Sequence, residues 1–221
     1  MLQSSIRNLF ESVQYLSDDA TAAFLLSLCQ ITLATAKPKG SSAESRSFGV
    51  AKITEASMHI IDRLLVGESK TWDTVMDTLT VLAASEDAGV RMQASEAITE
   101  IVHAGVEKIE YKKVEATPEL QERLLRPLLT AARIPFAEVQ AMQLQMLYQM
   151  LQTGGHSMTH SWPLILEALS SVAEKAAQQK LNPAIESTLK YAFQSLQVRV
   201  DMKLNILRGK GDIRTFANPT R

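Results

Sequence analysis

Two histidines stand four residues apart, at His156 and His160, a spacing with which a helix presents two metal ligands on one face. They follow Gly154-Gly155 in a stretch of Gly, Ser and Thr that predicts a loop. No third His, Cys or carboxylate stands beside them, so we expect no metal site. The glycine pair follows a predicted helix rather than a strand, which argues against a phosphate-binding loop. The segment is interpreted as a loop that orients the next helix.

The other reactive side chains show no catalytic arrangement. His59 and His103 fall within predicted helices, far apart and without a nucleophile to activate. Glutamates crowd residues 95–100 and 107–115, but lysines interleave with them, which is typical of a solvated face. Cys29 is the only cysteine and lies in an apolar run, so it is predicted to fill the core. We therefore predict that the chain is not an enzyme and binds no cofactor; an unrecognised active site is the one alternative in that class.

The two tryptophans occupy matched positions. Trp72 and Trp162 each follow a Ser or Thr at the start of a predicted helix. Their first interpretation is structural, with each indole packed across the preceding helical hairpin. The second is that they are anchors for a partner protein, because tryptophan is enriched at the centres of interfaces. The sequence alone does not decide between these two interpretations. The same two interpretations, a structural role or a contact with a partner protein, apply to His156 in the predicted loop before Trp162.

Charge and hydropathy exclude several classes of protein. The 221 residues carry 23 basic and 24 acidic side chains, a net charge of -1, with no basic run that would mark a nucleic-acid surface. No apolar stretch approaches the roughly 18 to 20 residues needed to cross a bilayer, and the first ten residues do not form a secretory signal. A cytosolic protein is expected, with any membrane association peripheral and made through partners.

Apolar residues recur at helical spacing along almost the whole chain, and alternation with a period of two hardly appears. Proline, glycine and capping hydroxyls divide the pattern into about nine helices. A segment rich in Pro, Gly and Ser at residues 37–46 is predicted to be a mobile surface loop. The expected helices cover residues 1–15, 17–36, 48–65, 70–84, 88–106, 117–132, 136–151, 161–177 and 183–207.

Internal similarity relates these helices to one another. The helices that begin at Trp72 and Trp162 match at an offset of 90, and offsets of 49 and 40 relate Val90 to Val139 and to Val50. Two helices per 40 to 49 residues is the spacing of HEAT and armadillo repeats. Such pairs bury their apolar faces only by stacking on neighbours. The residues predicted to be buried between layers are Val90, Ile98, Ile101, Leu147, Leu151, Ile165, Leu169, Phe193 and Leu196.

The predicted fold is therefore all-α, a HEAT/armadillo-like right-handed α-solenoid of about four helix pairs. Residues 1–207 are assigned to the helical-repeat segment and 208–221 to an irregular tail, which is either disordered or the start of another repeat. Neither end has the polar outer face of a capping repeat. The chain is thus expected to be a segment of a longer protein.

Several short runs of residues together carry a family resemblance. They are SFGVAKI at 47–53, Arg63, Trp72, RMQASEA at 91–97, Arg126-Pro127-Leu128, LQTGGHS at 151–157, SWPLIL at 161–166 and AFQSLQ at 192–197. With these runs the chain resembles the Golgi and endosome scaffold family known from its monensin-sensitivity phenotype, a non-catalytic relative of the large Arf guanine-nucleotide-exchange factors. The predicted loop and tryptophan around residue 156 are also similar to repeats downstream of the exchange domain in those factors.

The resemblance implies a scaffold on the cytoplasmic face of trans-Golgi and endosomal membranes. The partners it implies are a Dopey-type protein, Arf-like small GTPases and a phospholipid flippase, without any residue set that transfers to this chain. The sequence shows no exchange-domain motif. The alternative function is a regulatory segment downstream of the catalytic domain in a large Arf exchange factor.

Overall fold

The computed structural model describes residues 8–36, 43–67, 69–111, 114–153 and 160–178, together with Lys190 and Gln194. Every regular element in this part of the chain is helical, as the apolar periodicity predicts. After a short helical turn at residues 8–11, the elements are η1 (Ser12–Tyr15), α2 (Asp18–Thr35), α3 (Ala43–His59), α4 (Ile61–Val66), α5 (Ser69–Ala83), α6 (Ala88–Glu110), α7 (Pro118–Ala132), α8 (Ala137–Thr153) and α9 (Trp162–Gln178).

Side-chain caps fix where three of these helices begin. The Ser17 hydroxyl accepts a hydrogen bond from Ala20 N at the start of α2, and the Thr117 hydroxyl accepts one from Leu120 N at the start of α7. Asp87 does the same for α6, where its carboxylate accepts from the second and third backbone N–H groups. Pro118 follows Thr117 at the first helical position, where a missing N–H costs nothing. The predicted starts of α2 and α7 are confirmed.

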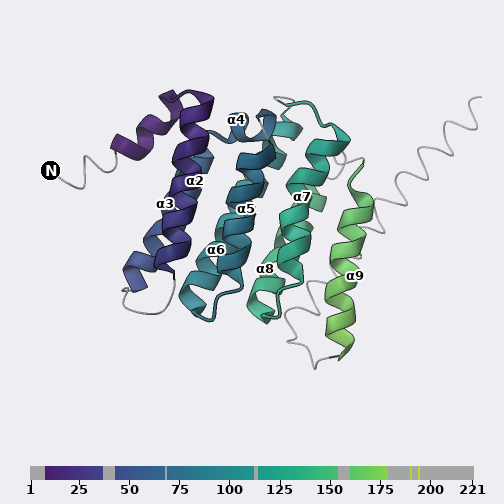
Figure 1. Ribbon diagram of the computed structural model, residues 1–221. Coiled ribbons are helices and arrows are strands. Elements are labelled where there is room, and N and C mark those ends of the chain that lie inside the picture. The colour runs from purple at the N-terminus through teal and green to yellow at the C-terminus, as the bar shows by residue number, and fades with distance from the viewer. Residues whose placement is uncertain are drawn as a thin grey trace, which may run out of the picture.

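The segment predicted as one helix over residues 48–65 differs from the structure in two ways. Helix α3 already begins at Ala43, so residues 43–46 of the expected loop are helical. Residues 37–42 lie outside the described residues. The helix then breaks at Ile60, whose φ of -121° and ψ of 19° end α3 and start α4. The break redirects the chain, so that α4 crosses the top of the molecule toward α5 (Figure 1).

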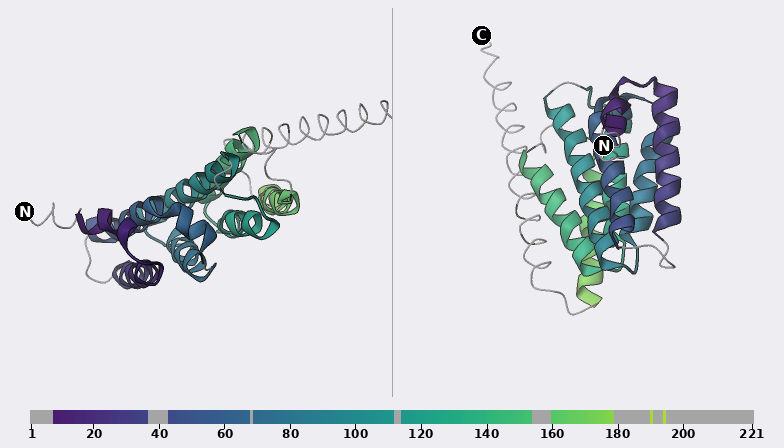
Figure 2. Two further views of the ribbon diagram at one scale, coloured as in Figure 1. Left: turned by 90° about the horizontal axis from the view of Figure 1, so that it is seen from above. Right: turned by 90° about the vertical axis from the view of Figure 1, so that its left-hand side faces the viewer.

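The long helices form two layers. Helices α2, α5, α7 and α9 lie side by side in one layer, and α3, α6 and α8 lie side by side in the other (Figure 1). Each chain hairpin packs one helix from either layer together, as α2 with α3, α5 with α6 and α7 with α8. The left view of Figure 2 shows the two rows of helices from above. Successive helix pairs thus stack on one another along the molecule.

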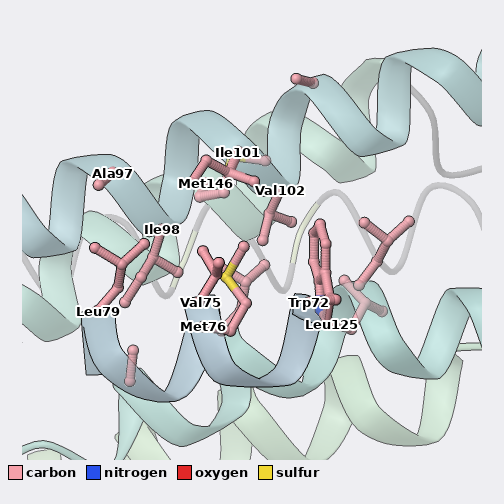
Figure 3. Close-up of a cluster of buried hydrophobic side chains, with 14 of the residues drawn as sticks. Trp72, Val75, Met76, Leu79, Ala97, Ile98, Ile101, Val102, Leu125 and Met146 are labelled. Carbon is pink, nitrogen blue, oxygen red and sulfur yellow. The ribbon is translucent and has the colours of Figure 1, made fainter. Parts of the chain in front are cut away.

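The apolar core runs between the two layers. Trp72, Val75, Met76 and Leu79 of α5 face α6 across this space, as Figure 3 shows. Nine residues were predicted to be buried between the layers, and the structure describes the side chains of six of them. All six are buried, whereas the side chains of Leu151, Phe193 and Leu196 lie outside the described part of the chain. The six buried residues are Val90, Ile98, Ile101, Leu147, Ile165 and Leu169.

Gly105 marks one of the close approaches between helices of the stack. A Cβ built on Gly105 of α6 would lie 2.5 Å from Cδ2 of Leu124 in α7 and 3.4 Å from Cδ2 of Leu65. Real carbon atoms do not approach to 2.5 Å, so any larger side chain at Gly105 would displace Leu124, which is fully buried. A glycine at this position of α6 therefore lets α7 pack closely against it.

Candidate interaction surfaces

Trp72 lies in the core. Only 1% of its surface is exposed, and its indole Nε1 donates a hydrogen bond to Arg123 O at 3.2 Å. In a regular helix that carbonyl accepts from the residue four positions later, which here is Pro127 and has no N–H. The indole therefore supplies the donor that the proline inside α7 removes. The Trp72 side chain is not part of any exposed surface.

Trp162 differs from Trp72 despite the matched position in the sequence. It is half-buried at the start of α9, where it packs against the edge of the core. Two other matched pairs of positions agree, since Val75 and Ile165 are both buried, as are Leu79 and Leu169, whereas Met76 is buried and its counterpart Leu166 is exposed. Trp162 thus keeps part of its indole on the surface.

Gln121 of α7 fixes the segment that leads into α9. Its side chain is fully buried, and its Oε1 accepts hydrogen bonds from the backbone N–H of His160 at 3.0 Å and from the hydroxyl of Ser161 at 2.8 Å. Its Nε2 donates to Ala116 O at 3.0 Å. The sequence analysis did not identify this residue, because a glutamine between Leu120 and Glu122 on a helix carries no local sign of a buried role.

The histidines do not assemble a metal site in the part of the chain that is described. His156 lies outside the described residues, and the His160 side chain is exposed. His59 is also exposed, and His103 Nδ1 is 3.9 Å from Glu107 Oε1 one turn along α6. Across the described residues no three His, Cys, Asp or Glu side chains gather closely enough to hold a metal ion.

Cys29 is a core residue, as predicted. Its exposed fraction is 1%, and it is unpaired among the described residues. Burial raises the pKa of the Cys29 thiol, and a hydrogen bond with the Thr78 side chain lowers that pKa by a smaller amount. Because the reactive species is the thiolate, a raised pKa makes the thiol unreactive near neutral pH.

Arg91 is the buried charge that ties two helix pairs together. Its guanidinium donates to Glu138 Oε1 at 2.9 and 2.6 Å, to Ser85 O at 2.7 Å, and lies 3.8 Å from the centre of the Phe136 ring. The pKa of Glu138 is lowered, first by a hydrogen bond from its own backbone N–H and then by the one from Arg91. Arg91 therefore joins α6, the end of α5 and the start of α8.

Three further ion pairs join helices that are distant in the sequence. Arg63 of α4 pairs with Asp18 of α2 at 2.6 Å and donates to the Thr21 hydroxyl at 3.0 Å. Lys108 of α6 reaches Asp62 of α4 at 2.8 Å, and Arg133 after α7 reaches Glu167 of α9 at 2.6 Å. All three pairs are more exposed than the pair of Arg91 and Glu138, so salt screens them more strongly.

A groove lies between α3 and α6, with a volume of about 480 Å³. We call it the α3/α6 groove. It mixes apolar side chains with three carboxylates and is open to solvent. Its lining residues are Val50, Ala51, Thr54, Glu55, Met58 and His59 of α3 and Gln93, Glu96, Ala97 and Glu100 of α6.

Two other depressions carry more balanced charge. One of about 300 Å³ lies between α2, α4 and α5, where Arg63 is paired with Asp18 and Asp19 is also present. A smaller one of about 50 Å³ lies between α5 and α7 and combines two aspartates with two arginines, Arg123 and Arg126. The α3/α6 groove is therefore the depression with the largest volume and the most one-sided charge of these three.

Comparison with known proteins shows which family these stacked helices resemble. Residues 108–195, which include α7, α8 and α9, match the family described as Sec7-like HDS, the HDS region of Mon2/Sec7/BIG1-like proteins. No solved structure matches the chain. Within the described residues, none of the helices is long and apolar enough to span a bilayer.

The most similar relatives compared bear the name MON2. The chain is 28% identical to the Protein MON2 homolog of Xenopus laevis and 27% identical to that of Homo sapiens, in each case over 201 residues or 90% of the chain. It is 20% identical over 169 residues, 76% of the chain, to Brefeldin A-inhibited guanine nucleotide-exchange protein 1 of Arabidopsis thaliana. The predicted family resemblance is confirmed: the chain is similar to the Mon2/Sec7-like proteins. It spans 11% of the length of those two MON2 homologues and 10% of the exchange protein.

Proposed function

We propose that the chain is a non-catalytic helical-repeat segment of a peripheral membrane-trafficking scaffold, which binds other proteins on the cytoplasmic face of trans-Golgi and endosomal membranes. The observation that supports this most directly is the similarity to MON2 homologues across 90% of the chain. The stacked helices support it as well, because such stacks present extended surfaces for protein partners.

The repeat organisation is part of the proposal. Positions related by the offset of 49 have the same burial, since Val90 and Val139 are both buried, and so are Ile98 and Leu147. Equal burial at a fixed period is what stacked repeats produce. We therefore assign residues 1–207 to a HEAT/armadillo-like right-handed solenoid of about four helix pairs, with 208–221 as an irregular tail.

The proposed partners are a Dopey-type protein, Arf-like small GTPases and a phospholipid flippase. Among the three residues singled out in the sequence, Trp72 is assigned a structural role because its indole is buried. Trp162 and His156 are proposed as contact residues, since Trp162 is partly exposed and His156 stands six residues before it in the sequence. A partly exposed tryptophan suits an interface anchor.

Two measurements with the purified chain test the scaffold function. Binding to a purified Dopey-type protein and to GTP-loaded Arf-like GTPases is expected in surface plasmon resonance. Release of a fluorescent GDP analogue from Arf is expected to stay at its spontaneous rate when the chain is added. Acceleration of that release would contradict the non-catalytic assignment, and failure to bind any of these proteins would contradict the scaffold assignment.

The role of Trp162 is tested separately. Trp162→Ala is expected to lower the melting temperature only modestly, because the side chain is half-buried, and to weaken binding of the Dopey-type protein by about tenfold or more. Trp162→Phe serves as the conservative control and should retain most of the binding. A variant that melts far below the parent and loses binding only in proportion to unfolding would make Trp162 a structural residue.

The second candidate function is a regulatory segment downstream of the exchange domain in a large Arf guanine-nucleotide-exchange factor. The similarity to the Arabidopsis thaliana exchange protein over 76% of the chain favours it. The coding sequence upstream of the chain separates the two proposals. An exchange domain encoded there would establish this second function, and its absence from the complete gene would leave the scaffold.

A further inference from the structure

The α3/α6 groove has apolar walls and a rim that carries uncompensated negative charge. Val50 of α3 and Ala97 of α6 are buried at its base, and Met58 is partly buried on its wall. Glu96 and Glu100 stand on successive turns of α6, exposed at the rim. Residues four apart on a helix place their Cβ atoms about 5–6 Å apart on one face. The two carboxylates therefore form a short negative stripe along an apolar surface.

No cation in the described residues neutralises this stripe. Glu55, on the opposite wall, pairs with Lys52, whereas neither Glu96 nor Glu100 takes part in an ion pair within the described ranges. His59 also lines the groove and is the one basic side chain among the described lining residues. The two smaller depressions differ, because one holds an arginine paired with one of its two aspartates and the other holds two arginines with two aspartates. The negative field is thus concentrated at the α3/α6 groove, where it attracts a positively charged partner.

The chemistry of the lining narrows the occupant to one class. A phosphate or nucleic acid is repelled by the carboxylates, and the described side chains do not gather into a metal site. A trough between two neighbouring helices, apolar along its base and charged at its rim, suits an amphipathic helix laid into it. The occupant would place small or aliphatic residues on Ala51 and Met58, which are at least partly exposed, and basic residues over the rim.

We propose that the α3/α6 groove is a docking site for an amphipathic helix of a partner protein that carries lysine or arginine residues four positions apart, opposite Glu96 and Glu100. This inference rests on the proposed scaffold function, because it names the surface through which one partner binds. It goes beyond that function by stating the chemistry of the recognised segment.

The test uses the full 221-residue chain and a synthetic amphipathic helical peptide with two lysines four residues apart beside a leucine face. We expect saturable binding in fluorescence anisotropy that weakens as the NaCl concentration rises, since the attraction is electrostatic. Glu96→Lys with Glu100→Lys is expected to weaken the affinity at least about tenfold. Glu86→Lys with Glu115→Lys makes the same change of charge outside the groove and should alter the affinity less than about twofold.

A second measurement locates the peptide without any variant. In the methionine methyl NMR spectrum, peptide addition should shift the Met58 signal and leave the signal of Met76, which is buried in the core, unchanged. No saturable binding up to roughly millimolar peptide would overturn the proposal. Equal affinity of the parent and the groove variant, or a Met58 signal that does not move, would overturn it as well.

The outcomes separate this proposal from the scaffold function. Binding of the trafficking proteins without binding of the basic peptide would overturn the groove alone. Binding of the peptide in the groove, with no binding of the trafficking proteins, would retain the groove and overturn the assignment of those partners.

Discussion

The hydrogen bond from Trp72 to α7 offers a sharp test of how the stack is stabilised. Trp72→Phe keeps most of the apolar ring in the core but removes the indole N–H that donates to Arg123 O. That carbonyl then has no donor, because residue 127, which would supply one in a regular helix, is proline. The substitution therefore combines a small loss of packing with an orphaned carbonyl.

The two contributions have comparable sizes. An unsatisfied buried acceptor costs about 1–3 kcal/mol. The smaller phenyl ring leaves a gap that costs about another 1 kcal/mol. We expect Trp72→Phe to lower the free energy of unfolding by about 2–4 kcal/mol in the parent. In a Pro127→Ala background the backbone N–H of residue 127 is available to Arg123 O, so Trp72→Phe should cost only the packing contribution.

The assay is a double-mutant cycle on Trp72 and Pro127. Urea unfolding of the parent, both single variants and the double variant is followed by far-ultraviolet circular dichroism, and the free energies are compared where a single transition is seen. We expect a coupling energy of about 1–2 kcal/mol, because the two residues share one carbonyl. If Trp72→Phe costs the same with proline and with alanine at 127, the indole does not replace the missing donor and the reasoning is wrong.

Other predictions concern charge and burial. Arg91→Ala should lower the free energy of unfolding by about 2–3 kcal/mol, whereas Arg126→Ala, which breaks an exposed pair, should change it by less than about 0.5 kcal/mol in urea denaturation. Because the pKa of Glu138 is lowered, its contribution to the free energy of unfolding is complete above the ordinary glutamate pKa of 4.5 and is lost as the pH falls below that value. The difference in stability between the parent and Glu138→Gln should therefore shrink in acid. A difference that grows in acid would show that the pKa of Glu138 is not lowered by folding. Cys29 should react with a thiol reagent only after unfolding, and labelling of the native protein at the unfolded rate would show that the thiol is accessible.

Helix positions followed from the sequence where a local signal marked them. The hydroxyls of Ser17 and Thr117 and the proline after Thr117 predicted helix starts that the structure confirms. The apolar period predicted which residues face the core, because a helix that packs on one side must repeat its apolar residues every three or four positions. Val90 and Ile98, which are buried, follow this rule.

The break at Ile60 could not be predicted in this way. No proline or glycine marks it, and the apolar pattern continues without a change of phase. The break turns α4 across the stack and brings Arg63 to Asp18, which lies 45 residues earlier in the chain. A contact of that kind is tertiary and leaves no local sign in the sequence.

The candidate surface was missed for a related reason. Glu96 and Glu100 were interpreted as part of a solvated face, and they are exposed. Their neighbours across the groove belong to α3, however, about 40 residues away in the sequence, so their position over an apolar trough depends on stacking. The burial of Trp162 likewise could not be predicted from the sequence, because its match with Trp72 in position does not give it the same burial.

The ion pairs between helix pairs have a mechanical consequence. A stack of helix pairs bends at the junctions between neighbours, and each ion pair acts as a strut across one junction. The struts made by Lys108 with Asp62 and by Arg133 with Glu167 are exposed, so their stiffness falls as ionic strength rises. The strut of Arg91 is less exposed and loses less of its stiffness in salt. The stack therefore does not bend evenly along its length. It is stiffer around α6 and α8 than at the junctions on either side, which become softer as salt is added.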